Sequence, residues 1–268
     1  MGRGSEMAGP KPLRSVESAL AVLEALGDGG AEHSVTDLSR SLGLSKAAVY
    51  RALATLRACG YVRQNPTTDR YALTLKCWRL AMAAQEQFRF VPLAQPYLER
   101  LCAEVREAIN LAVYEDGQAV YIAQVQSPQP IGVLPTPGGG GPAHCVATGK
   151  VLLAYQPDEV IQHLIACGLT KYTELTHATE ESLRAELNRI RSNEYAINRG
   201  EWRSQVCGVA APIWDHEGRV IASVGACGPI QHFSPGNVQH MIECVVATAR
   251  AISEQLGWKP KSGARAAS

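Results

Sequence analysis

The stretch 34-SVTDLSRSLGLSKAAVYRALATLRA-58 decides the fold of the first part of the chain. Residues 34–37 carry a capping-box pattern, in which a serine hydroxyl and an aspartate carboxylate satisfy free amides at a helix start. We expect Gly43 to end this short helix and Ser45 to cap a second helix over residues 46–58. A helix, a glycine turn and a second helix together predict a helix-turn-helix.

Two flanking elements complete this predicted unit. Apolar residues at helical spacing after Ser15 predict a helix before the quoted stretch. After it, residues 60–64 and 70–74 alternate like two short strands, and residues 65–69 between them are rich in turn formers. This hairpin is the wing of a winged helix-turn-helix, which we expect over residues 13–74.

The distribution of charge indicates what this unit faces. Residues 38–68 contain no aspartate or glutamate, so every charged side chain in this stretch is a lysine or an arginine. The first 90 residues carry a net charge of +4, whereas residues 91–268 carry −3. Clustered lysine and arginine without acids are typical of a surface that neutralises phosphates, so double-stranded DNA is the expected partner.

The exposed face of the predicted helix over residues 46–58 offers the side chains for reading DNA. Side chains on its first turns reach base edges, while cations at its flanks and on the wing reach phosphates, so we expect readout by Lys46, Tyr50 and Arg51. The alternative is a solvated helix face and solvated charges on an edge strand. The complete candidate set is Thr36, Ser45, Lys46, Ala47, Tyr50, Arg51, Arg57, Arg63 and Arg70.

These residues carry a family resemblance. The chain resembles the IclR family of bacterial transcriptional regulators in residues 14–20, 36–39, 43–46, 50–56 and 60–62. The resemblance runs to about Trp258 and implies a linker helix over residues 75–91 that helps to pair subunits. It also implies a homodimer, or a dimer of dimers, on a (pseudo)palindromic operator.

The remaining sequence predicts a sensing domain over residues 92–258, and we expect disorder in residues 1–12 and 259–268. Asp-Gly and Glu-Gly turns predict two hairpins, over residues 109–126 and 206–227. With the predicted helices, these hairpins give an α/β (α+β) chain whose second domain is a GAF/PAS-like antiparallel sheet flanked by helices. The other expected elements are helices over 93–106, 143–155, 158–167 and 180–192, a strand over 131–134 and a long helix capped by Ser234.

The resemblance also implies where an effector binds. Ala147 and Thr148 match positions where family members hold a carboxylate through main-chain N–H groups at a helix start. On the second wall, Asn198, Gly208, Gly225 and Cys227 stand where relatives that sense small oxo-acids carry an acid, a cysteine and two serines. Fewer donors and more volume favour a larger aromatic or acyl carboxylate.

Neighbouring side chains complete the candidate effector site. Arg199, Trp202 and Arg203 stand beside the second wall, where each either faces the ligand or is simply solvated. Of these three we favour Arg199. The whole candidate set is Val133, His144, Ala147, Thr148, Asn198, Arg199, Cys207, Gly208, Gly225 and Cys227.

Several other classes are disfavoured. His144 and Cys207 have no nucleophile-elbow pattern around them, so we expect no enzyme. The eight cysteines form no CxxC or CxxH pair, so we expect neither a metal nor a cofactor. No apolar run approaches the roughly 20 residues that span a bilayer and no signal pattern begins the chain, so we expect a cytoplasmic protein without membrane contact.

We therefore expect an effector-controlled transcriptional regulator of a catabolic operon. The alternatives are a cysteine-dependent small-molecule hydrolase with a nucleic-acid-binding domain, and a non-specific DNA-binding protein. The position of the operator decides between repression and activation, and the sequence does not record it.

Overall fold

The computed structural model describes residues 13–27, 32–85, 88–129 and 139–259. The chain divides into two compact units, with the division between Phe88 and Arg89. The residues for which we expect disorder, apart from Lys259, and the strand expected over residues 131–134 lie outside the described residues. Within the described ranges, none of the helices combines the length and apolar character that crossing a membrane requires.

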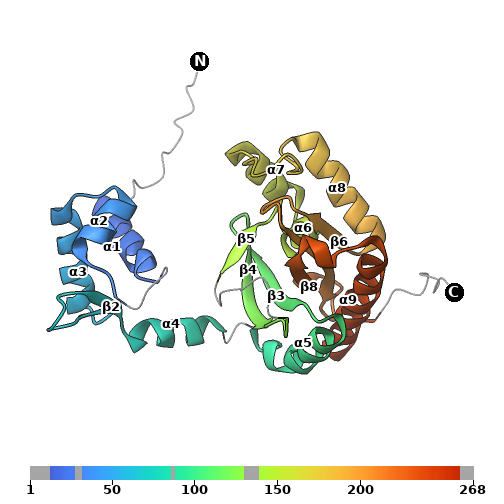
Figure 1. Cartoon of the computed structure of the whole chain (residues 1–268), viewed down its shortest axis with the longest axis horizontal. Helices are drawn as coiled ribbons and strands as arrows, with labels where there is room; N and C mark the ends of the chain where they lie inside the picture. Colours follow the sequence, from blue (N-terminus) through green and yellow to red (C-terminus); the bar gives the residue numbers. More distant parts are fainter. Residues whose placement is uncertain (1–12, 28–31, 86–87, 130–138, 260–268) are drawn as a thin grey trace, which may run out of the picture. The chain divides into compact units, whose positions relative to one another are not determined.

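The first unit is the expected winged helix-turn-helix (Figure 1). Val22, Leu38, Val49 and Leu53 are almost completely buried between its helices and form its core. Its elements are α1 (Arg14–Ala25), α2 (Val35–Leu42), α3 (Lys46–Ala58), β1 (Val62–Gln64), β2 (Tyr71–Leu73) and α4 (Leu75–Gln85).

The caps predicted from sequence are present in the first unit. The Ser34 hydroxyl accepts a hydrogen bond from the Asp37 amide at 3.1 Å, and the Asp37 carboxylate accepts one from the Ser34 amide at 3.4 Å. Gly43 ends α2 with a φ of 64°, a left-handed conformation that glycine adopts without strain. Ser45 caps α3 by accepting from the Ala48 amide at 3.2 Å. These local bonds fix the angle between α2 and α3.

Among its described residues the first unit has seven large apolar side chains that are at least half exposed, and one of them is Tyr50 on α3. Of the other six, three lie at the N-cap and in the first two turns of α1, and three lie on α4. The six residues are Leu13, Val16, Leu20, Leu75, Trp78 and Leu80. We call this set the apolar stripe of the first unit.

The linker differs from expectation. The sequence predicted one helix from residue 75 until Pro92 breaks it, but α4 ends at Gln85 and a new helix, α5 (Val91–Val105), contains that proline in its first turn. Proline suits a first turn because the amide it lacks has no helical partner there. Pro92 therefore belongs to the start of a helix and is not the residue that ends the preceding one.

The second unit is one antiparallel six-stranded sheet with helices on both faces (Figure 1). Helices α6 (Ala147–Ala154), α7 (Asp158–Cys167) and α8 (Glu180–Asn193) share a core on one face, while α5 and α9 (Pro235–Gln255) cover the other. The strand order is β5 (Gly140–Pro142), β4 (Gln118–Val125), β3 (Ala108–Glu115), β8 (Val220–Pro229), β7 (Val206–Trp214) and β6 (Ala196–Arg199).

Both expected hairpins are present. Asp116 and Gly117 take φ values of 44° and 79° between β3 and β4, as the predicted Asp-Gly turn requires. The edge strands β5 and β6 were not expected. Helix α6 begins at Ala147, four residues later than predicted, because residues 143–146 form a turn. Ser234 occupies the N-cap position of α9, but its side chain makes no capping hydrogen bond.

Replacing Ser34 by alanine removes the half of the capping box that the serine hydroxyl supplies. We expect Ser34→Ala to lower the free energy of unfolding of the first unit by about 1 kcal/mol, because the Asp37 amide loses its acceptor, while the amide of residue 34 keeps the Asp37 carboxylate. Urea denaturation followed by circular dichroism measures this loss. Thr67→Ala is the matched control, because Thr67 is exposed and its hydroxyl has no hydrogen bond within the described residues. Equal stability of the two variants would contradict the role of the cap.

Candidate functional site

The exposed face of α3 presents the residues expected to read DNA. Lys46, Ala47, Tyr50, Arg51 and Arg57 are all exposed, while the opposite side of α3 is buried in the core of the first unit. Within the described residues, the side chains of Lys46 and Arg51 have no hydrogen bond or ion pair. Their charges are therefore available to bases and phosphates.

Ser45 and Arg57, two other predicted residues, have local partners. Ser45 caps α3, whereas Thr36 lies exposed in the first turn of α2. Arg57 donates a hydrogen bond to the Gln64 side-chain oxygen at 2.8 Å, and the Gln64 amide group in turn donates to Asp69 at 3.3 Å. Arg57 thus connects the end of α3 to the wing.

The wing arginines face an acid that the sequence reasoning missed. Glu32 lies 4.0 Å from Arg63, and its backbone oxygen accepts a hydrogen bond from Arg70 at 3.3 Å. Hydrogen bonds from Asn65 and then Thr68 hold the pKa of Glu32 below its ordinary value. Ion pairs of this length between exposed side chains contribute little, so a DNA phosphate can replace them.

In the second unit, the start of α6 has free main-chain donors. Val146 occupies the N-cap position without a side-chain acceptor, and the first helical bond runs from the Lys150 amide to the Val146 oxygen at 2.9 Å. The amides of Ala147, Thr148 and Gly149 come before that bond and therefore have no carbonyl partner within the helix. Such amides, together with the helix dipole, attract an anion.

Glycines let α6 approach the sheet closely. A Cβ on Gly225 of β8 would lie 2.9 Å from the Thr148 methyl group, and a Cβ on Gly208 of β7 would lie 3.7 Å from that of Ala147. On α6 itself, a Cβ on Gly149 would come within 2.5 Å of the backbone of Ala143. The sequence predicted extra pocket volume at Gly225, but the Thr148 side chain fills the space beside it.

The face of the sheet that packs on α6 carries several polar side chains. Register places Asn198, Gly208 and Cys227 side by side on β6, β7 and β8, and cross-strand neighbours share one face. The Asn198 side chain is buried and its oxygen accepts a hydrogen bond from the Glu201 amide at 2.9 Å. On β3, Asn110 donates to the Cys227 sulfur at 3.2 Å.

Three further polar residues on this face, Asn110, Tyr121 and Gln124, were not identified from sequence. Asn110 is buried and lies directly opposite Gln124, and the side-chain oxygen of Asn110 and nitrogen of Gln124 have no partner within the described residues. Burial raises the pKa of Tyr121 to about 12, although the nearby Thr148 hydroxyl and Arg203 cation lower it. A polar residue inside the apolar strand that follows Ala108 is the signal that could have revealed Asn110. We call Asn110, Tyr121, Gln124, Thr148 and Cys227 the polar cluster.

Two predicted residues lie on the other face of the sheet. Arg199 on β6 lies opposite Cys207 on β7, and their chain neighbours Asn198 and Gly208 face α6. Because successive side chains of a strand point to opposite faces, Arg199 and Cys207 point away from α6. Arg199 is exposed and Cys207 is buried. Arg203, by contrast, lies 4.4 Å above the Trp202 ring and close enough to Tyr121 to affect its pKa. The structure therefore favours Arg203 over Arg199.

His144 has a structural position, and Val133 lies outside the described residues. The His144 Nε2 lies 3.1 Å from the Thr170 carbonyl, which can only accept, so this nitrogen carries the proton. Burial lowers the pKa of His144 and keeps the ring neutral. His144 therefore connects the turn before α6 to the loop that follows α7.

A buried ion-pair network anchors α6 from its inner side. The Lys150 ammonium group is fully buried and donates to Glu201 at 2.7 Å, to the Ile197 oxygen at 2.9 Å and to Glu186 at 3.0 Å. Arg189 binds Glu186 through two hydrogen bonds, of 2.7 and 2.9 Å. Burial raises the pKa of Glu186, but Arg189 and Lys150 outweigh it and lower the value to about 2. No sequence pattern indicated this network.

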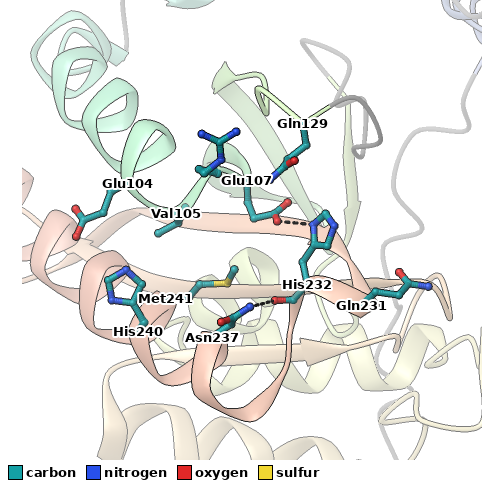
Figure 2. Close-up of a pocket in the computed structure, with 10 residues that line it drawn as sticks. Glu104, Val105, Glu107, Gln129, Gln231, His232, Asn237, His240 and Met241 are labelled. Carbon is teal, nitrogen blue, oxygen red and sulfur yellow. Dashed lines mark hydrogen bonds and ion pairs between the residues drawn. The ribbon is translucent and has the colours of Figure 1, made fainter.

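On the opposite face of the sheet, α5 and α9 enclose a pocket of about 340 Å³ (Figure 2). Glu107 is buried there and lies 2.6 Å from the His232 Nδ1. Burial raises the pKa of Glu107, although the contact with His232 lowers it. Glu104 and His240 also line this pocket.

The buried thiols are poorly suited to nucleophilic catalysis. Burial raises the pKa of Cys207, and it raises the values of Cys145 and Cys227 to about 12 and about 11. A nucleophilic cysteine needs a lowered pKa, because the thiolate is the reactive form. This electrostatic setting disfavours the hydrolase alternative.

A winged helix-turn-helix followed by a sensing domain of this architecture defines an effector-responsive transcriptional regulator. The chain belongs to the IclR family: the profile of the IclR helix-turn-helix domain matches residues 15–66, and that of the bacterial transcriptional regulator IclR C-terminal domain matches residues 82–254. The resemblance recognised in the sequence is thereby confirmed.

Full-length relatives support this assignment. The chain is 31% identical to the transcriptional regulator KdgR of Dickeya chrysanthemi over 93% of this chain and 82% of that protein. It is 26% identical to the transcriptional repressor AllR of Klebsiella pneumoniae over 96% and 95% of the two chains. These relatives are named as regulators of transcription, not as enzymes.

Solved structures share the fold. An IclR transcriptional regulator from Alicyclobacillus acidocaldarius superposes with a TM-score of 0.76 at 22% identity, over 92% of this chain and 100% of that one. An IclR homologue from Microbacterium hydrocarbonoxydans, complexed with 4-hydroxybenzoate, gives 0.76 at 24% identity, over 90% and 98%. At these identities the likeness establishes the fold.

Replacing Lys150 by methionine tests the network that anchors α6. We expect Lys150→Met to lower the free energy of unfolding of the second unit by about 3–5 kcal/mol, because Glu186 and Glu201 then stay buried without their ammonium partner. Urea denaturation measures the loss. The double variant Lys150→Met with Glu201→Gln should recover part of it, because it removes one of the uncompensated charges. Additive losses would contradict a coupled network.

Proposed function

We propose that the chain binds a (pseudo)palindromic operator as a homodimer or dimer of dimers, and that a carboxylate-bearing effector beside α6 changes this binding. The observation that carries the effector part is the start of α6, whose unbonded amides adjoin the polar cluster. An anion at those amides and a polar group against Asn110 and Gln124 together satisfy donors and acceptors that have no partner among the described residues.

The apolar stripe supports the assembly of two chains. Six large side chains on one compact unit, each at least half exposed, need a cover, and a second copy offers the same surface to itself by two-fold symmetry. Two heads joined in this way place two α3 helices on successive turns of one DNA face. Operator symmetry then reflects protein symmetry.

The local contacts of the cations support different roles for them in DNA binding. Within the part of the chain that the structure describes, Lys46 and Arg51 lie on the first two turns of α3 without partners, whereas Arg57, Arg63 and Arg70 already contact the wing or Glu32. We assign base readout to Lys46, Tyr50 and Arg51 and phosphate contact to the others. A non-specific DNA-binding protein needs no such exposed and unpaired reading set.

The walls of the effector site suggest a hydroxylated aromatic or an acyl carboxylate. Tyr121 and Trp202 supply aromatic surface, and Arg203 over the Trp202 ring is the cation that we assign to a second contact with the effector carboxylate. The free oxygen of Asn110 accepts a hydrogen bond, which an effector hydroxyl or amide donates and a small oxo-acid does not. The Microbacterium relative, which holds 4-hydroxybenzoate, shows that this fold accommodates a ligand of that kind.

The effector controls transcription only through differential affinity. It must bind one arrangement of the subunits better than another, since equal affinity shifts no equilibrium. We propose that the regulated genes form a catabolic operon for such acids. We also propose that the protein is cytoplasmic. We further propose that it has no catalytic activity, and the raised pKa values of the Cys145 and Cys227 thiols support this second proposal.

Replacing Arg51 by alanine tests base readout. An operator selected from random duplexes and a scrambled duplex are compared by fluorescence anisotropy at one salt concentration. We expect Arg51→Ala to lose about 1–3 kcal/mol of discrimination between them, because a bidentate contact to a base edge disappears. Arg79→Ala, which replaces another exposed arginine, on α4, should keep it. Unchanged discrimination in Arg51→Ala would overturn the assignment.

Replacing Arg203 by alanine tests the effector site. The full-length chain is screened by thermal shift against hydroxybenzoates, acyl amides and two- or three-carbon oxo-acids, and we expect stabilisation by the larger carboxylates. Arg203→Ala should reduce this shift, while Arg199→Ala, on the other face of the sheet, should leave it unchanged. A response only to the small oxo-acids, or loss of the shift in Arg199→Ala alone, would contradict the proposal.

A further inference from the structure

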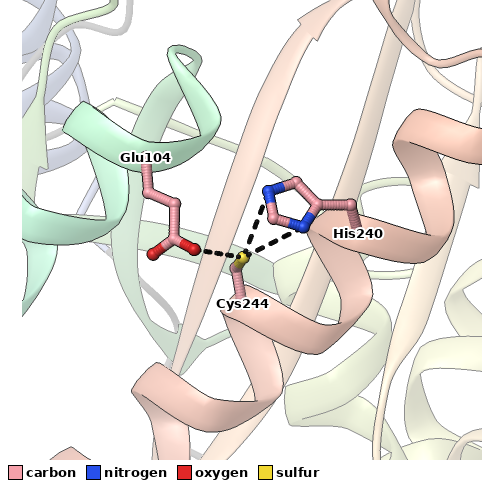
Figure 3. Close-up of side chains that lie close together, drawn as sticks. All are labelled: Glu104, His240 and Cys244. Carbon is pink, nitrogen blue, oxygen red and sulfur yellow. Dashed lines mark hydrogen bonds between the residues drawn. The ribbon is translucent and has the colours of Figure 1, made fainter.

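Three side chains with different metal-binding atoms converge where α5 packs on α9 (Figure 3). His240 and Cys244 are one helical turn apart on α9, and Glu104 reaches them from the last turns of α5. The Cys244 thiol donates to the Glu104 carboxylate at 3.1 Å, and its sulfur lies 3.7 and 3.6 Å from the His240 Nδ1 and Nε2. The three ligand atoms lie within 4.8 Å of one another.

These separations suit a tetrahedral metal ion. With Zn–S of about 2.3 Å and Zn–N of about 2.05 Å, tetrahedral angles place sulfur and nitrogen about 3.5 Å apart. The Cys244 sulfur already lies within a few tenths of an ångström of that separation from either ring nitrogen of His240. Only one of these nitrogens can bind the ion, so the ring has to turn to direct its lone pair at the metal. The shorter separation of sulfur and carboxylate oxygen is that of a thiol hydrogen bond, which a metal would replace.

The surroundings favour a cation with an open coordination position. Glu104 and His240 also line the pocket between α5 and α9, where a water molecule has room to complete the coordination (Figure 2). Three protein ligands and one exchangeable position are typical of a zinc site open to solvent.

A second histidine–cysteine pair in the chain shows what is specific to this place. His163 and Cys167 on α7 have the same spacing, and their sulfur and Nε2 lie 3.6 Å apart. Within the described residues, however, no carboxylate joins this pair, and the group formed by Glu104, His240 and Cys244 is the only one of its kind. The carboxylate from a facing helix therefore distinguishes the α5–α9 place from an ordinary neighbouring pair.

We propose that Glu104, His240 and Cys244 bind one divalent zinc ion, with water in the fourth position. Binding releases the thiol proton of Cys244 to solvent, and the thiolate, the imidazole and the carboxylate each donate one electron pair to the metal. The ion connects α5 to α9 on the face of the sheet opposite the polar cluster. The site is therefore separate from the proposed effector site and independent of the proposed function.

Cobalt titration of the full-length chain tests the site directly. After reduction and removal of metals, we expect one Co²⁺ per chain, with the visible bands of a tetrahedral ion and a near-ultraviolet charge-transfer band from thiolate sulfur. Zn²⁺ should displace it and abolish both signals. Loss of a ligand should weaken binding at least about tenfold, since even residues that only support ligands cost that much.

Matched variants decide which residues bind. Cys244→Ser should lose the charge-transfer band, while His240→Gln and Glu104→Gln should weaken Co²⁺ binding and keep that band at saturation. Cys167→Ser should behave like the unaltered chain. Circular dichroism confirms folding of each variant, and the exposure of Glu104 and His240 makes their replacement mild. An unchanged charge-transfer band in Cys244→Ser, or unchanged affinity in both His240→Gln and Glu104→Gln, would overturn the proposal.

Discussion

The close approach of α6 to strands β7 and β8 is the constraint on which the second unit depends. Side chains at positions 149 and 225 would collide with backbone or with Thr148, so glycine at both places permits the approach. The buried Lys150 then fixes the rotation of α6, because its ammonium group has three partners at defined positions. Buried ion pairs add little net stability but strongly penalise other arrangements. The start of α6 is thereby held against the polar cluster, where an anion can meet free amides and side-chain acceptors together.

Most of the fold was predictable where local chemistry determines it. The capping box at Ser34, the left-handed glycine at position 43 and the Asp-Gly turn at position 116 each specify a backbone conformation without help from distant residues. Strands β5 and β6 were missed because they are short, and their strand state depends on pairing with β4 and β7. The start of α6 was placed too early because residues 143–146 look helical in sequence but form a turn against the sheet.

The two candidate sites differed in how far sequence could identify them. The DNA-reading face lies on one helix, so spacing alone placed Lys46, Tyr50 and Arg51 together. The proposed effector site combines β3, β4, α6 and β8. Asn110 stands out locally only as a polar residue in an apolar strand, and nothing local distinguishes Tyr121 or Gln124 from other strand residues. Arg199 was favoured because the strand β6 was not expected, and the alternation of β6 is what turns Arg199 away from α6. The search for CxxC and CxxH pairs also could not detect a histidine and a cysteine one helical turn apart that meet a glutamate more than a hundred residues away.

The apolar stripe of the first unit makes its stability depend on how much of the protein a cell holds. Under the proposed dimer, covering Leu75, Trp78 and their neighbours requires a second chain, so association adds to the free energy of the folded head in proportion to the logarithm of concentration. At a low concentration of the protein, fewer first units are paired, and the unpaired ones are also less stable. Operator occupancy should therefore rise more steeply than in direct proportion to abundance, which gives a threshold of gene dosage before any effector is present.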